Sequence, residues 1–82
     1  MLTIYGSDRC PDCIACKEAL DKAGVAYTYL SITEDLHNLK QYLLLRDTRE
    51  EFASIRGTER IGIPCILDDG GKLSFEWDMY LK

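Results

Sequence analysis

The first third of the chain alternates between strand-like and helix-like patterns. Residues 2–5 are mainly apolar and are followed by a Gly-Ser pair that ends a predicted strand. A helix is predicted over 11–23, because proline at position 11 suits a first helical turn and Gly24 a stop. Four apolar residues at helical spacing form its predicted buried face: Cys13, Cys16, Leu20 and Ala23.

A second strand and a second helix are predicted in the middle of the chain. Residues 25–32 are rich in β-branched and aromatic side chains, which favour a strand. Ser31 and Glu34 have the spacing of a capping box, and Thr33 is an alternative cap for the helix that follows. The predicted inward face of this helix carries three leucines at helical spacing: Leu36, Leu39 and Leu43.

This helix is predicted to break near Asp47. Thr48 and Glu51 offer a second capping box, which would begin a further helical segment over 49–56 that ends at Gly57.

The last third of the chain reads as a β-hairpin with a short tail. Residues 63–67 and 72–75 are the predicted strands, joined by an Asp-Asp-Gly-Gly turn, and 76–82 could add one helical turn. The order is β-α-β-α-β-β with a C-terminal helical stub. A βαβ unit followed by a hairpin predicts a single α/β domain, residues 1–82, with a mixed sheet flanked by helices.

Composition narrows the functional classes. The chain has 82 residues, of which 46% are hydrophobic and 29% charged, values that are ordinary for a folded globular domain. A net charge of −4 argues against nucleic acid as a partner. We see no secretory signal and no apolar run approaching the ~20 residues that span a bilayer, so we expect a cytoplasmic, non-membrane protein. In a reducing compartment the four cysteines favour redox or metal chemistry over structural disulfides.

Two of these cysteines have redox spacing. Cys10 and Cys13 flank Pro11 and Asp12 at the predicted strand-to-helix junction, where a helix N-terminus favours a thiolate. Cys10 is therefore the predicted nucleophile, and Cys13, one turn later, the predicted resolving thiol. The Asp12 charge disfavours the thiolate and Arg9 partly offsets it, which predicts a reducing pair.

The sequence Cys10-Pro11-Asp12-Cys13, followed much later by Ile63-Pro64 at the start of a strand, resembles the glutaredoxin branch of the thioredoxin-fold family. The resemblance covers about residues 1–75. It implies a thioredoxin-like fold and thiol–disulfide oxidoreductase activity.

The resemblance also implies a cis-proline at Pro64 that faces the redox pair, with the Ile63 backbone presented to the substrate and Cys65 nearby. With Arg9, Pro11 and Asp12, these three residues complete the expected substrate-binding set. The partners implied are a disulfide-containing protein or glutathione, with glutathione or a reductase as electron donor. We expect a monomer with no tightly bound cofactor.

Two positions depart from the family pattern. Phe75-Glu76-Trp77-Asp78 stands where glutaredoxins usually carry a Gly-Gly-Asp-like signature that helps hold the glutathione carboxylate, and Ser7 replaces a frequent basic residue. Both differences concern glutathione recognition and leave the cysteine pair unchanged.

Two other functional classes fit the same residues. Four thiolates could bind zinc or an iron–sulfur cluster: Cys10, Cys13, Cys16 and Cys65. Alternatively, the fold could serve as a redox-inert adaptor. Cys16 and Cys65 are also typical of small buried core residues, and four arginines could form a basic rim for a carboxylate or be ordinary solvated charges: Arg46, Arg49, Arg56 and Arg60.

Overall fold

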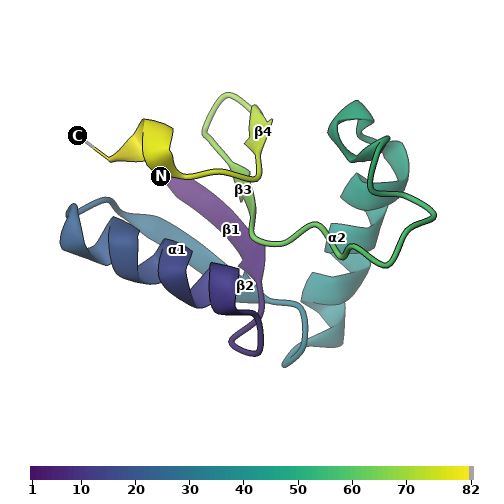
Figure 1. Ribbon diagram of the computed structural model, residues 1–82, viewed down its shortest axis with the longest axis horizontal. Coiled ribbons are helices and arrows are strands. Elements are labelled where there is room, and N and C mark those ends of the chain that lie inside the picture. The colour runs from purple at the N-terminus through teal and green to yellow at the C-terminus, as the bar shows by residue number, and fades with distance from the viewer. Residues whose placement is uncertain (82) are drawn as a thin grey trace.

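The computed structural model describes residues 1–81 and forms a four-stranded mixed sheet with helices on both faces (Figure 1). The elements follow in the order β1 (Leu2–Gly6), α1 (Pro11–Lys22), β2 (Tyr27–Ser31), α2 (Leu36–Thr48), η1 (Glu50–Phe52), β3 (Cys65–Leu67), β4 (Leu73–Ser74) and η2 (Asp78–Tyr80). The predicted fold class is confirmed, and η2 supplies the predicted helical turn before Lys82, which lies outside the described residues.

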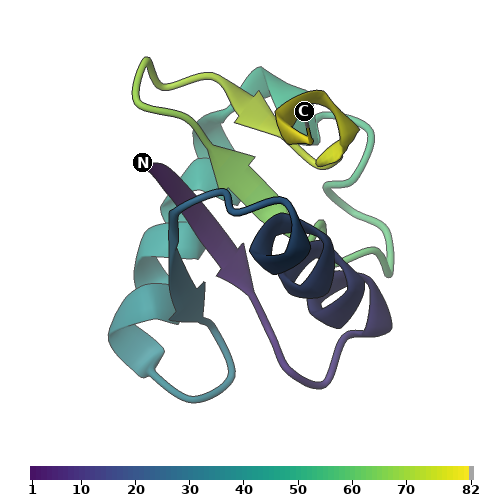
Figure 2. The same cartoon turned by 90° about the vertical axis from the view of Figure 1, so that its left-hand side faces the viewer.

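The strands lie in the order β2-β1-β3-β4, with β1 parallel to β2 and antiparallel to β3. Because β1 pairs Ile4 with Ile66 and Tyr5 with Cys65, alternate residues of both strands point to opposite faces. Ile4 and Ile66 pack with Cys16 under α1, whereas Tyr5 and Cys65 pack in the second cluster. Figure 2 shows α1 in front of the sheet and α2 behind it.

The buried face of α1 is confirmed for Cys13, Cys16 and Leu20, each 0% exposed, but Ala23 is exposed at the C-cap. The prediction for α2 was right for Leu39, which packs partly buried against the core, and wrong for Leu36 and Leu43. Leu36 is 71% exposed, and Tyr42 is the buried residue of this helix, at 1%. The spacing of the leucines alone could not show which side of the helix faces the sheet. Tyr42 lies on that side, where its ring packs against the rings of Tyr5 and Phe52.

Both predicted helix caps in this region were also wrong. The N-cap of α2 is Asp35, whose carboxylate accepts from the backbone N–H of His37 at 2.8 Å, while Ser31 accepts from the Glu34 N–H in the preceding turn. Thr48 ends α2 by donating its hydroxyl to the Leu44 carbonyl, so it caps no new helix.

The predicted second helical segment over 49–56 is reduced to the single turn η1. The guanidinium of Arg56 donates to the carbonyls of Arg46 and Arg49, which ties this stretch back to the end of α2 in place of a regular helix. Within residues 1–81, no helix is both long and apolar enough to cross a bilayer.

Candidate active site

Cys10 occupies the N-cap of α1, at the end of the short loop that follows β1. Its backbone N–H donates to the Ser7 carbonyl at 3.1 Å, and its own carbonyl accepts from Ile14 at 3.1 Å, so the residue is fixed at the first turn. Pro11 takes the first helical position, where a missing N–H costs nothing. The half-exposed Cys10 sulfur caps none of the helix amides, which leaves it available beside a helix N-terminus.

Cys13 lies one turn later and is fully buried. Burial, together with the neighbouring thiol of Cys10, raises the pKa of the Cys13 thiol to about 12. A side chain at Gly6 would begin 3.0 Å from the Cys13 sulfur, a tight contact, so glycine at the end of β1 lets this sulfur pack there without displacement. The two cysteines thus differ in access, because Cys10 is partly exposed and Cys13 is fully buried.

The loop that leads into β3 faces the cysteine pair. The Ile63–Pro64 peptide bond is cis, and the Ile63 carbonyl oxygen lies 4.0 Å from the Cys10 sulfur. Gly62 precedes it with φ of +89°, and a side chain there would meet both the Phe52 ring and the Tyr42 hydroxyl at 2.9 Å. The same Tyr42 hydroxyl donates to the Ile61 carbonyl. Core residues of the α2 side therefore hold this loop in position.

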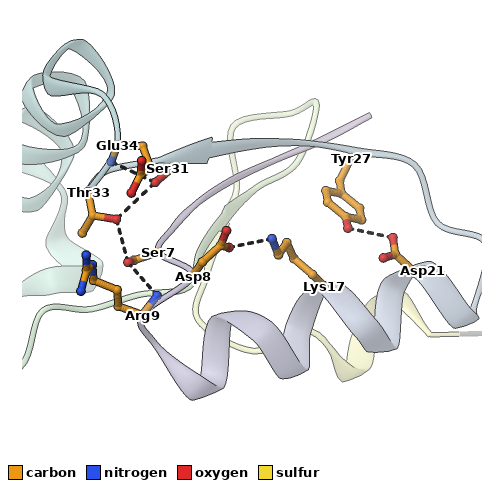
Figure 3. A network of polar contacts seen from close by, with 9 residues as sticks. All are labelled: Ser7, Asp8, Arg9, Lys17, Asp21, Tyr27, Ser31, Thr33 and Glu34. Atoms are coloured by element: carbon orange, nitrogen blue, oxygen red, sulfur yellow. Dashed lines mark hydrogen bonds and ion pairs between the residues drawn. The ribbon is translucent and has the colours of Figure 1, made fainter.

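A hydroxyl network fixes the turn between β1 and α1 (Figure 3). Ser7, which is 2% exposed, accepts from the Arg9 backbone N–H at 3.1 Å and shares a 2.9 Å hydrogen bond with the Thr33 hydroxyl. Thr33 in turn lies 3.3 Å from the Ser31 hydroxyl at the end of β2. The network joins residues 7–9, which lead into Cys10, to residues 31–33 at the end of β2. The sequence did not reveal this structural role of Ser7 and Thr33.

Lys17, on α1, makes a second set of polar contacts close to the site. Lys17 donates to Asp8 at 2.8 Å and places its ammonium 4.0 Å from the centre of the Tyr29 ring. The hydrogen bond from Lys17 lowers the pKa of Asp8. The buried Tyr29 hydroxyl has no hydrogen-bond partner among the described residues, and its burial, with Cys13 and Asp8 nearby, raises the pKa of Tyr29.

Cys10 opens into a cleft of about 1160 Å³. The start of α1 lines one side of the cleft, the loop 59–64 another, and the segment 73–78 the third. Arg9, Asp12, Ile63 and Pro64 line it together with Cys10. A substrate disulfide that enters the cleft can therefore reach the Cys10 sulfur, which lies next to the Ile63 carbonyl and at the N-terminus of α1.

A comparison with protein-family models matches residues 2–67 to the family described as Glutaredoxin. This chain belongs to the glutaredoxin family. It is also 35% identical, over 68 residues, to an uncharacterized protein of Haemophilus influenzae, in an alignment that covers 83% of this chain and 79% of the other. No solved structure gives a significant match.

The glutaredoxin fold brings together most, but not all, of the residues that the sequence suggested. Pro11 is exposed at the start of α1 and does not line the cleft. Cys65 was expected to contact the substrate, yet the structure buries it completely behind the cleft. Because Cys65 pairs with Tyr5 in the sheet, its side chain points to the α2 face, away from the surface.

The four cysteines do not meet at one point. Cys16 belongs to the cluster under α1, and Cys65 to the cluster on the opposite face of the sheet. Within residues 1–81, no group of three or more His, Cys, Asp or Glu side chains is placed to hold a metal ion. Burial raises the pKa of Cys16 to about 11 and that of Cys65 to about 12, as expected for thiols packed in apolar cores. The four-cysteine metal site is therefore not formed.

Three of the four arginines considered for a basic rim point elsewhere. Arg46 donates to the Ile55 and Arg60 carbonyls, and Arg56 also donates only to backbone carbonyls. Arg49 pairs with Glu51 at 3.0 Å and donates to the Gly71 carbonyl. Of this group only Arg60 lines the cleft.

Proposed function

We propose that the protein is a thiol–disulfide oxidoreductase that reduces protein or glutathione mixed disulfides with Cys10 as nucleophile and Cys13 as resolving thiol. The observation that carries the proposal is the unequal access of the two sulfurs. Cys10 is half-exposed at the N-cap of α1, and Cys13 is 0% exposed one turn later. Membership of the glutaredoxin family supports the same class of reaction.

In the first step the Cys10 thiolate attacks one sulfur of the substrate disulfide. A bond forms between Cys10 and that sulfur, and the other substrate sulfur leaves as a thiolate that takes a proton from water. In the second step Cys13 loses its proton to solvent and attacks the Cys10 sulfur, releasing the second substrate thiol. The substrate gains two electrons and two protons, and Cys10 and Cys13 are left as a disulfide.

The high pKa of Cys13 fits the second role. A thiol with a pKa of about 12 stays protonated near neutral pH, so it does not compete with Cys10 for the substrate. Its attack becomes effective when the mixed disulfide holds the Cys10 sulfur nearby, since proximity replaces a bimolecular collision.

A dithiol or two molecules of glutathione would return two electrons to the Cys10–Cys13 disulfide. Glutathione is the usual co-substrate of the family, and a reductase protein is the other donor that we consider. We further propose that the protein acts in the cytoplasm, because a reducing compartment keeps Cys10 and Cys13 available as thiols. We also propose that it acts as a monomer.

The test is a trapping experiment with mass detection. The Cys13→Ser variant, mixed with a disulfide-linked peptide, should accumulate a mixed disulfide on Cys10, whereas the unmodified protein should release both thiols and end as an internal disulfide. The Cys10→Ser variant should do neither. Cys16→Ser is the matched control, because Cys16 is a buried thiol on the same helix outside the cleft, and it should behave like the unmodified protein. Equal turnover by Cys10→Ser would refute the role of Cys10, and no reduction of the disulfide by the unmodified protein would favour a redox-inert adaptor.

A further inference from the structure

The cleft around Cys10 carries an excess of negative charge. Two guanidinium groups line it, from Arg9 and Arg60. Five carboxylates also line it: Asp12, Glu51, Glu59, Glu76 and Asp78. All seven side chains belong to exposed residues, so their charges act on whatever approaches the sulfur.

Nearby cations do not cancel this excess. Arg49 pairs with Glu51, which removes one carboxylate from the balance and still leaves four against two. Arg46 and Arg56 donate to backbone carbonyls at the end of α2 and in the segment that follows it, and they do not line the cleft. The carboxylates come from separate parts of the chain, at the start of α1, in the loop before β3 and after β4, so the negative charge is spread over the lining of the cleft that contains Cys10.

The same cleft offers contacts suited to a polypeptide. Ile61 is 56% exposed, and the partly buried Trp77 also lines the cleft. The Ile63 carbonyl beside Cys10 can accept a hydrogen bond from a backbone N–H of an extended segment. An indole face also attracts ammonium and guanidinium groups.

We propose that this site selects disulfides flanked by lysine or arginine in a polypeptide and disfavours glutathione disulfide, whose carboxylates outnumber its ammonium groups. The inference rests on the proposed function and adds the class of substrate. The reaction is the exchange described above: Cys10 bonds to one substrate sulfur, the second leaves as a thiol, and Cys13 completes the two-electron reduction. Opposite charges in the cleft and on the substrate raise the rate of encounter, and salt screens this effect.

The test compares three small disulfides of similar size and different charge. These are cystamine, a dication, hydroxyethyl disulfide, which is neutral, and dithiodiglycolate, a dianion. The rate constant for each with the reduced protein is divided by the rate constant with dithiothreitol, which corrects for intrinsic reactivity. We expect the order cation, neutral, anion, with about tenfold between the extremes at low ionic strength and a smaller ratio at high ionic strength. A pair of disulfide-linked peptides with lysine or glutamate flanks should show the same preference.

Paired variants assign the effect to the cleft. Replacing two lining carboxylates, Glu59→Gln with Glu76→Gln, should reduce the cation-to-anion ratio several-fold. The control, Glu18→Gln with Asp47→Asn, changes the net charge equally at exposed helix positions outside the cleft and should leave the ratio unchanged.

The outcomes separate the two proposals. Reduction of hydroxyethyl disulfide without any preference among charges, with a preference for the anion, or with an equal loss of preference in both double variants would overturn the inference and leave the proposed function standing. Failure to reduce any of the disulfides, the neutral one included, would overturn both.

Discussion

The sulfur of Cys10 lies 4.0 Å from the carbonyl oxygen of Ile63, a residue 53 positions further along the chain. This contact joins the N-terminus of α1 to the loop before β3. It places a half-exposed thiol beside a backbone acceptor at the edge of a cleft. The other three cysteines should react much more slowly than Cys10, because each of them is 0% exposed.

A short treatment of the reduced, folded protein with iodoacetamide near neutral pH should modify Cys10 alone. Cys13, Cys16 and Cys65 are buried, and their pKa values of about 11 to 12 keep them as thiols. Peptide mapping by mass spectrometry locates the label. In denaturant all four cysteines should react. Early labelling of Cys65 in the folded protein would show that the cleft reaches deeper than the structure indicates.

Replacing Gly62 with alanine should destabilise the fold more than replacing Gly71. Both glycines have positive φ, +89° and +85°, so each substitution carries a similar backbone cost of about 1 kcal/mol. The methyl group of an alanine at position 62 would also meet Phe52 and Tyr42, whereas the described part of the chain places nothing within 4 Å of a methyl group at position 71. Urea unfolding should therefore give Gly62→Ala an additional loss of about 1–3 kcal/mol from overpacking. Equal losses would show that the loop yields easily.

Some parts of the site could be predicted from local sequence. The pattern Cys10-Pro11-Asp12-Cys13 follows a short apolar run, and Pro11 fits only the first helical turn, so the N-cap position of Cys10 was predictable. The resemblance carried by Ile63-Pro64 predicted the cis bond, which the structure confirms.

Other features depend on contacts that are remote in sequence. Whether Cys65 points into the cleft or into the core depends on its pairing with Tyr5, a register that no local pattern determines. The burial of Tyr42 and the exposure of Leu36 likewise depend on where α2 crosses the sheet. The acidic lining combines Asp12 with residues from the second half of the chain, so it became visible only in the folded structure.

The buried thiols should make the protein less stable at alkaline pH. The pKa of Cys65 rises on folding from its ordinary value of 9.0 to about 12, because burial penalises the thiolate. Above pH 9 the unfolded chain loses this proton while the folded chain keeps it, so the stability contribution is complete below pH 9 and is lost between about 9 and 12. Each such group contributes at most about 1.4 kcal/mol per pH unit.

Urea unfolding at a series of pH values in a phosphine reductant measures this slope. Cys65→Ala should flatten the slope above pH 9, even though the variant starts from a lower stability. Ile66→Val is the control, since it weakens a neighbouring buried position that carries no proton, and its slope should match that of the unmodified protein. An unchanged slope in Cys65→Ala would mean that Cys65 does not contribute to the alkaline loss.

The charge of Asp12 should make the Cys10–Cys13 couple more reducing. Asp12 lies in the first turn of α1 and lines the cleft together with Cys10, so its negative charge disfavours the addition of electrons to the Cys10–Cys13 disulfide. Asp12→Asn keeps the shape and removes the charge. The variant should have a less negative reduction potential, by up to about 30 mV, which corresponds to a tenfold change in the equilibrium constant of a two-electron couple. Equilibration with glutathione buffers, followed by thiol counting, measures the change. Asp12→Glu retains the charge and should keep the original potential, and an Asp12→Asn potential that is unchanged or more negative would refute this role.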